Sequence, residues 1–145
     1  MSALRAIARQ PAAYLFATFA TLRTAMRLTR MEKRHRFDEL VVHLRRDSPL
    51  PGPFRDPMVY GRVANRLAHY LPPRRMGYCI KRSLWLVNLW TRCGLEPKIH
   101  IGLQRTGPNL QGHAWLTLEG QSGAAFDLEP LLGTPEPGYP DFFAF

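Results

Sequence analysis

The residue types that can do covalent chemistry in this chain are Cys79, His113 and Asp127. Cys79 follows a short basic loop and precedes a long apolar stretch, so we expect it to open a buried helix. The unpaired amide groups and the dipole at a helix start stabilise a thiolate, and Lys81 and Arg82 add positive potential. The position of Cys79 therefore indicates a nucleophile.

A cysteine nucleophile needs a base, and His113 begins an alternating segment that predicts a strand. If Ala114 faces the core, His113 faces the other side of the sheet. Asp127 lies in the next predicted strand, 124–128. An odd-length turn would bring Asp127 within reach of the His113 ring, whereas an even-length turn would put it on the wrong face. Spacing alone thus makes Cys79, His113 and Asp127 a candidate nucleophile, base and orienting group, although a strand histidine is often only an ordinary polar residue.

The second cysteine, Cys93, is expected at the C-terminal end of the same helix, where the dipole disfavours a thiolate. We expect it to be a small core residue. A zinc site built from Cys79, Cys93, His100 and His113 is an alternative. The cysteine spacing of fourteen matches no common zinc finger, so we expect no metal.

The elements that must position these residues change type along the chain. Helical spacing of apolar residues predicts four helices, at 12–30, 31–46, 57–71 and 79–93. Alternation predicts three strands, at 98–104, 113–119 and 124–128, followed by a Pro/Gly-rich tail. Helices followed by antiparallel strands indicate an α+β fold, with the 79–93 helix buried at its centre.

Prolines and glycines mark the ends of several of these elements. Asp56 and Pro57 are typical of a helix start, and Gly94 is typical of a helix end. A stiff, extended Pro-rich stretch is the best internal boundary. The chain is thereby divided into a basic helical segment, a Pro-rich connector and a catalytic core with its tail, at 1–48, 49–56 and 57–145.

Two helix faces can also be predicted. The packed face of the helix at 12–30 is expected to include Leu15 and Leu22, and the helix is expected to continue through 31–46. The helix at 79–93 is apolar on most sides. Three of its polar residues are expected to mark a solvent-exposed stripe: Lys81, Asn88 and Arg92.

The charge is large and uneven. The 145 residues contain 20 Lys and Arg against 11 Asp and Glu, a net charge of +9. Residues 1–75 hold 15 basic and 5 acidic side chains, whereas residues 76–145 hold 5 and 6. The basic half is expected to face a partner or anionic lipid, or to be a plain solvated surface. A non-enzymatic nucleic-acid-binding protein is an alternative that this charge allows. Without a recognition motif or a ladder of stacking aromatics, however, nucleic acid is not the expected partner.

The cellular setting can be inferred from the same residues. Two cysteines do not form a disulfide scaffold, and no secretory signal is evident. The apolar stretch after Pro11 meets Arg23 and Arg27 before it could span a bilayer. We therefore expect a cytoplasmic protein, with peripheral membrane contact open to its basic N-terminal helices.

Three strings of residues resemble the transglutaminase-like cysteine protease superfamily: Tyr78–Leu84 (YCIKRSL), Ile99–Leu103 (IHIGL) and Gly112–Trp115 (GHAW). More narrowly, they resemble the leader peptidases of lasso-peptide biosynthesis. That family has a Cys-x-x-Arg-Ser-Leu helix, a Leu/Ile-rich strand ending in Gly, a His-Ala-Trp strand and then an Asp. The resemblance spans residues 57–128.

The resemblance implies a papain-like core with Cys79 as nucleophile, His113 as general base and acid, and Asp127 as the orienting carboxylate. It implies hydrolysis of the amide bond after a leader peptide through a thioester, without a cofactor. Interception of that thioester by an amine, as in transglutaminases, is the alternative. The chain departs from the family pattern at two places. Gly112 stands where the family more commonly has Ala. A long turn precedes Asp127, so Glu119 is the substitute candidate for the orienting carboxylate.

The resemblance also implies partners. The substrate would be a precursor peptide made of a leader and a core. Nothing in residues 1–48 resembles the winged-helix module that some relatives carry, which implies a separate leader-recognition protein. The freed core would pass to a separate ATP-dependent lasso cyclase, because this chain has no G-x-x-x-x-G-K-[ST] phosphate loop.

Overall fold

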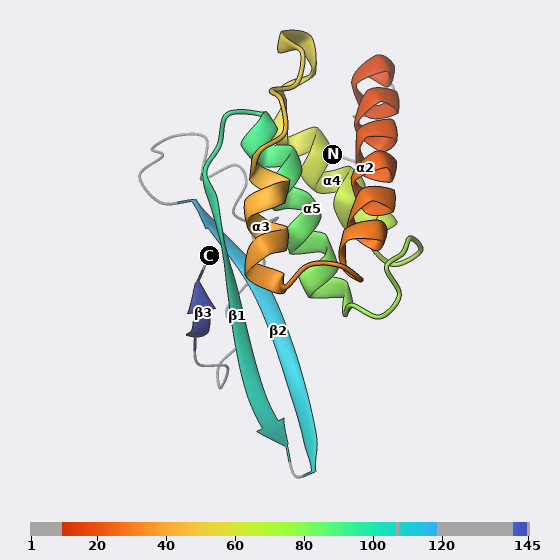
Figure 1. Cartoon of the computed structure of the whole chain (residues 1–145). Helices are drawn as coiled ribbons and strands as arrows, with labels where there is room; N and C mark the ends of the chain where they lie inside the picture. Colours follow the sequence, from red (N-terminus) through yellow and green to blue (C-terminus); the bar gives the residue numbers. More distant parts are fainter. Residues whose placement is uncertain (1–9, 107, 119–140, 145) are drawn as a thin grey trace.

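The computed structural model describes residues 10–106, 108–118 and 141–144, in which helices precede an antiparallel sheet (Figure 1). The helical elements are α2 (Pro11–Met31), α3 (Phe37–Arg45), the 3-10 turn η1 (Gly52–Phe54), α4 (Pro57–Leu67) and α5 (Tyr78–Arg92). The strands are β1 (Pro97–Thr106), β2 (Asn109–Leu118) and β3 (Asp141–Ala144). This arrangement confirms the predicted α+β class.

The sheet is built on a hairpin. β1 and β2 pair antiparallel in unbroken register from Pro97↔Leu118 to Thr106↔Asn109, and β3 pairs antiparallel with the other edge of β1. The order is β2-β1-β3. No strand was predicted at β3, because four residues within a Pro/Gly-rich tail carry a weak alternation signal. The strand predicted at 124–128 lies outside the described residues.

The core is centred on α5, as predicted. Residues 81–90 of this helix are all buried, and α2, α3, α4, β1 and β2 all contact it. Trp85 and Trp90 are its largest fully buried side chains. In Figure 1 the helices gather on one side of the hairpin, whose turn extends away from them. The position of α5 in the fold is therefore fixed on several sides.

A buried amide joins α5 to the N-terminal helices. Asn88 Oδ1 accepts a hydrogen bond of 2.9 Å from the Thr24 hydroxyl in α2. Asn88 Nδ2 donates to the Leu44 carbonyl in α3 at 2.7 Å and to Asp47 Oδ2 at 2.8 Å. Burial alone would raise the pKa of Asp47, but hydrogen bonds from Arg27 and Asn88 hold it below its ordinary value. The predicted exposure of Asn88 is therefore wrong, because partners from other helices satisfy its amide.

The packed face of α2 also differs from the prediction. Leu15 is 72% exposed and Leu22 is 37% exposed. The face that packs inward is built mainly of small residues: Ala17, Ala20, Thr21, Thr24, Ala25 and Leu28. Small side chains let the helix backbone approach α4 and α5 closely, so they occupy the core side.

Among the described residues, no helix is both long and apolar enough to cross a bilayer.

The helix predicted to continue through 31–46 is interrupted. Residues 32–36 separate α2 from α3, and Arg36 adopts an extended conformation. The Glu39 carboxylate accepts a hydrogen bond of 3.0 Å from the Arg36 amide, which caps the new helix start. This local cap allows the chain to turn and α3 to pack on α5.

The helix start at Asp56 and the helix end at Gly94 are confirmed, whereas the helix predicted at 57–71 ends earlier, at Leu67. Asp56 Oδ1 accepts a hydrogen bond of 2.9 Å from the Met58 amide at the start of α4. Gly94, which follows α5, has a φ of +94°, a conformation that glycine adopts without strain. The Leu95 amide then donates to the Trp90 carbonyl at 2.9 Å, which closes the helix.

The Pro-rich connector at 49–56 is packed against the helices and contains η1. Leu50 is fully buried, and its amide donates to the Arg92 carbonyl at 2.9 Å. Phe54 stacks on Phe16 of α2, with ring centroids 4.4 Å apart. These contacts fix the connector against both α2 and the end of α5.

Candidate active site

Cys79 is the second residue of α5. The residue before the helix, Gly77, has no side chain with which to cap the first turn. The Lys81 amide is the first to donate within the helix, to the Gly77 carbonyl at 3.1 Å. The earlier amides, including that of Cys79, have no partner within the helix. The thiol therefore lies at the positive end of the helix dipole.

The Cys79 thiol contacts strand β2. Its Sγ lies 3.9 Å from the carbonyl oxygen of Gly112, the length of a weak S–H···O hydrogen bond. Gly112 directly precedes His113, so standard backbone dimensions place this Sγ within roughly 7 Å of the His113 Cα. Two of the predicted site residues, far apart in sequence, are thus neighbours in the fold.

His113 and Trp115 share one face of β2, because side chains alternate along a strand. The His113 ring stacks on Trp115, with centroids 5.8 Å apart, and Trp115 stacks on His100 at 5.6 Å. His100 Nε2 lies 2.8 Å from the Thr117 hydroxyl. Ala114 is fully buried on the opposite face, as the alternation predicts. Cys79 therefore meets β2 at its backbone, next to the residue that carries the imidazole.

A buried guanidinium lies close to the candidate nucleophile. Arg82 is 6% exposed, and its Nε–H donates to the Asn65 side-chain oxygen in α4. Burial lowers the pKa of Arg82, whereas its interactions with Tyr78 and Cys79 raise it. The start of α5 therefore carries a buried positive charge that interacts with Cys79.

Lys81 has a different role from the one predicted. It is 5% exposed, so its predicted place on a solvent-exposed stripe is wrong. Its ammonium donates to the Leu71 carbonyl at 2.6 Å and lies 5.8 Å from the ring centroid of Trp85. Burial, together with the charge of Arg74, lowers the pKa of Lys81. Lys81 therefore ties the start of α5 to the preceding loop.

Comparison with known protein families gives a match over most of the chain. A family model described as the transglutaminase-like superfamily matches residues 6–129. The chain belongs to the transglutaminase-like superfamily. No curated protein and no solved structure gave a significant match. Members of this superfamily are typically cysteine-dependent enzymes, so the match suggests a cysteine protease or an acyltransferase.

The third predicted residue of this transglutaminase-like site is not placed. Asp127, and Glu119 as its substitute, both lie outside the described residues. The structure therefore brings together the elements that carry Cys79 and His113 and leaves the orienting carboxylate as a prediction.

Cys93 lies at the other end of α5 from Cys79. Fourteen helical residues separate the two thiols by roughly 21 Å. Burial, followed by the charge of Asp56, raises the pKa of the Cys93 thiol to about 12. In the part of the chain that the structure describes, no three His, Cys, Asp or Glu side chains gather as metal ligands would. The two cysteines cannot share one zinc ion.

Sequence reasoning missed a cluster beside the candidate nucleophile in this transglutaminase-like chain. The Tyr78 hydroxyl donates to the Asn65 carbonyl at 3.3 Å, and the His69 ring stacks on Tyr78 with centroids 4.1 Å apart. Asn65 also accepts from Arg82. The available signal was the i, i+4 spacing of Asn65 and His69 on the polar side of the predicted helix.

Proposed function

We propose that this chain is a cysteine peptidase that removes the leader peptide from a lasso-peptide precursor. The observation that carries the proposal is the 3.9 Å contact between Cys79 Sγ, at the start of α5, and the carbonyl of the residue before His113. The proposal is also supported by the superfamily to which the chain belongs, whose members are typically cysteine-dependent enzymes. The resemblance of Tyr78–Leu84 and Gly112–Trp115 to leader peptidases supports the choice of substrate.

The proposed reaction begins with attack of the Cys79 thiolate on the scissile carbonyl carbon. First-turn amides of α5, including that of Cys79, hold the oxyanion, because the helix gives them no other partner. His113 gives a proton to the leaving amine of the core peptide, and a thioester to the leader remains. A water molecule, activated by His113, then hydrolyses the thioester and frees the Cys79 thiol.

The remaining proposed roles concern orientation and charge. Arg82 places a positive charge beside Cys79, with which it interacts electrostatically. Asp127 accepts a hydrogen bond from His113 and holds the imidazole in a productive tautomer. Activities of Asp127→Ala and Glu119→Ala would decide between the two carboxylates, since the true partner should give the larger loss.

The proposed partners follow from this reaction. The substrate is a precursor with a leader and a core. A separate winged-helix protein presents the leader, and an ATP-dependent cyclase receives the freed core. The proposed setting is the bacterial cytoplasm, and nucleic acid has no part in the reaction.

Intact mass spectrometry tests the proposal. The chain is incubated with a lasso precursor, with and without the leader-recognition protein. We expect a leader and a core whose summed masses equal the mass of the precursor plus one water. The Cys79→Ala variant should give no cleavage. An intact precursor in the presence of the recognition protein would overturn the proposal.

Acyl transfer is the second candidate, because it uses the same thioester and occurs in the same superfamily. Adding a primary amine such as putrescine to the same incubation separates the two reactions. A leader that carries the amine in place of the new carboxylate would assign the chain to acyl transfer.

A further inference from the structure

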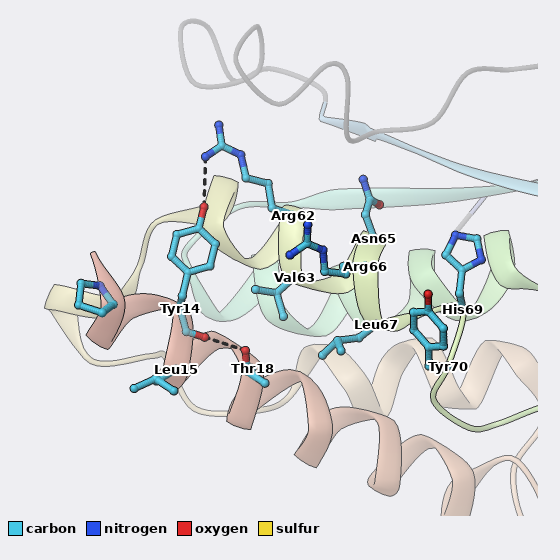
Figure 2. A pocket seen from close by; sticks show the side chains of 11 residues that line it. Tyr14, Leu15, Thr18, Arg62, Val63, Asn65, Arg66, Leu67, His69 and Tyr70 are labelled. Carbon is cyan, nitrogen blue, oxygen red and sulfur yellow. Dashed lines mark hydrogen bonds between the residues drawn. The ribbon is translucent and has the colours of Figure 1, made fainter. Parts of the chain in front are cut away.

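A groove lies between α2 and α4 on the outer side of the helices. It has a volume of about 820 Å³ and is open to solvent (Figure 2). Tyr14 and Arg62 lie at one end of the groove, and His69 and Tyr70 lie at the other. This stretch of α4 and its following turn measures roughly 12 Å, the length of about four residues of extended peptide.

The walls of the groove are apolar and its charge is positive. Leu15 is 72% exposed and Tyr70 is 76% exposed, unusually high values for large apolar side chains. Arg62 and Arg66 line the groove, and among the residues that the structure describes no acidic side chain lines it. Arg62 Nη1 donates to the Tyr14 hydroxyl at 3.2 Å, which holds one cation at the rim. Such walls complement a peptide with both apolar and acidic side chains.

The groove adjoins the candidate nucleophile. His69 and Asn65 both line it. His69 stacks on Tyr78 at 4.1 Å, and the Tyr78 hydroxyl donates to the Asn65 carbonyl at 3.3 Å. Tyr78 is the residue before Cys79. A chain lying in the groove is thus separated from the start of α5 by a single layer of side chains.

We infer that this groove binds an acidic stretch of the substrate polypeptide, about four residues long, beside the bond that Cys79 attacks. The inference rests on the proposed function, because it assumes that the substrate is a polypeptide. The apolar side chains of the substrate lie against Leu15 and Tyr70. Its carboxylates pair with Arg62 and Arg66, and Arg66 is an exposed residue with room to accept them.

Peptide binding tests the inference without catalysis. The probes are two fluorescently labelled octapeptides with the same apolar residues, one with two Glu and one with two Gln. Anisotropy is measured with Cys79→Ala, which does not consume the probe. We expect the Glu peptide to bind about tenfold more tightly than the Gln peptide. Leu15→Asp, at an exposed position, should weaken binding of both peptides.

The matched control is a second exposed arginine. Arg66→Glu should lower affinity for the Glu peptide about tenfold and Arg66→Lys should retain it, whereas Arg34→Glu, the same charge change between α2 and α3, should stay within about twofold. Equal binding of the two peptides, or equal effects of the two charge reversals, would overturn the inference. An eight-nucleotide single strand that binds more tightly than the Glu peptide, with the same dependence on Arg66, would also overturn it.

Cleavage separates this inference from the proposed function. With the precursor, Arg66→Glu should raise KM and leave kcat unchanged, because Arg66 does not touch the reacting atoms. Absence of cleavage by the unmodified chain would reject the peptidase, while the binding measurements on Cys79→Ala would still decide what the groove binds.

Discussion

Two cysteines lie at the two ends of α5, and the groups around them differ. Burial raises the pKa of Cys93 to about 12, so at pH 8 only about one molecule in ten thousand carries its thiolate. Cys79 lies at the positive end of the helix and interacts with the buried Arg82. The two cysteines are therefore expected to differ in reactivity.

Alkylation should distinguish the two thiols. In the folded chain at pH 8, iodoacetamide is expected to modify Cys79 and to leave Cys93 unmodified. Both thiols should react in urea. Peptide mapping by mass spectrometry reads out the sites, with Cys79→Ala as the unlabelled control. Faster labelling of Cys93 than of Cys79 would contradict the assignment.

Cleavage should depend on the pair formed by Cys79 and His113. We expect Cys79→Ala and His113→Ala each to lower the rate at least about a thousandfold, because the two residues act as a unit. Cys93→Ala, the matched control, should stay within about twofold. Circular dichroism confirms that each variant is folded. A Cys79→Ala variant that still cleaves would show that the nucleophile lies elsewhere.

Gly112 should tolerate a methyl group. A Cβ at this position would lie 3.4 Å from Leu103 Cδ2, an ordinary van der Waals contact. Cys79 meets the backbone carbonyl of Gly112, which the substitution retains. Gly112→Ala should therefore change the free energy of unfolding by less than about 1 kcal/mol and keep activity within about threefold. Loss of activity in a folded variant would mean that this backbone is less accommodating than the contacts indicate.

At the scale of elements, α5 depends on α2 and α3 for its position. Asn88→Ala would leave the Thr24 hydroxyl, the Leu44 carbonyl and Asp47 without their amide partner. We expect it to lower the free energy of unfolding by about 2–4 kcal/mol. Thr24→Val, which breaks only one of these bonds, should lower it by about 1–2 kcal/mol. Urea unfolding measures both, and equal losses would mean that the Leu44 and Asp47 bonds contribute little.

Local signals predicted the helix ends better than the helix faces. Asp and Gly are themselves preferred at helix starts and helix ends, so the positions of Asp56 and Gly94 could be predicted from the sequence. The burial of Lys81 and Asn88 depends on hydrogen-bond partners far away in sequence, which no periodicity reveals. The exposure of Leu15 similarly depends on which face of α2 the neighbouring helices can approach most closely.

The candidate site was predictable where each element carries its own signal. The loop followed by an apolar stretch predicted that Cys79 begins a helix, and the alternation predicted that His113 and Ala114 lie on opposite faces of a strand. Their proximity depends on how α5 meets the hairpin, which is a tertiary property. The groove between α2 and α4 was not predictable either, because two helices and the turn after α4 contribute to it.

For the whole molecule, stability should fall in alkaline solution. The folded chain keeps Cys93 protonated up to a pKa of about 12, whereas an exposed thiol ionises near 9.0. Burial also raises the pKa of Tyr60. Only the unfolded chain ionises between these values. The contribution of these two groups to the free energy of unfolding is therefore fully present below about pH 9 and is lost progressively towards pH 12.

Thermal unfolding followed between pH 8 and pH 12 checks this expectation. The melting temperature should fall above pH 9, and Cys93→Ala should make the fall shallower, because one of the two groups that titrate is removed. A melting temperature that is constant across this range would contradict it.

The hydrogen bonds of Asn88 also have a consequence for fragments of this protein. Its three partners, Thr24, Leu44 and Asp47, all precede the Pro-rich connector, so a recombinant fragment that begins at the connector would lack all of them. The fragment would expose the side of α5 that those helices cover, including a polar amide set among tryptophans and leucines. We expect it to accumulate in inclusion bodies, even though it would retain every residue assigned to the chemistry.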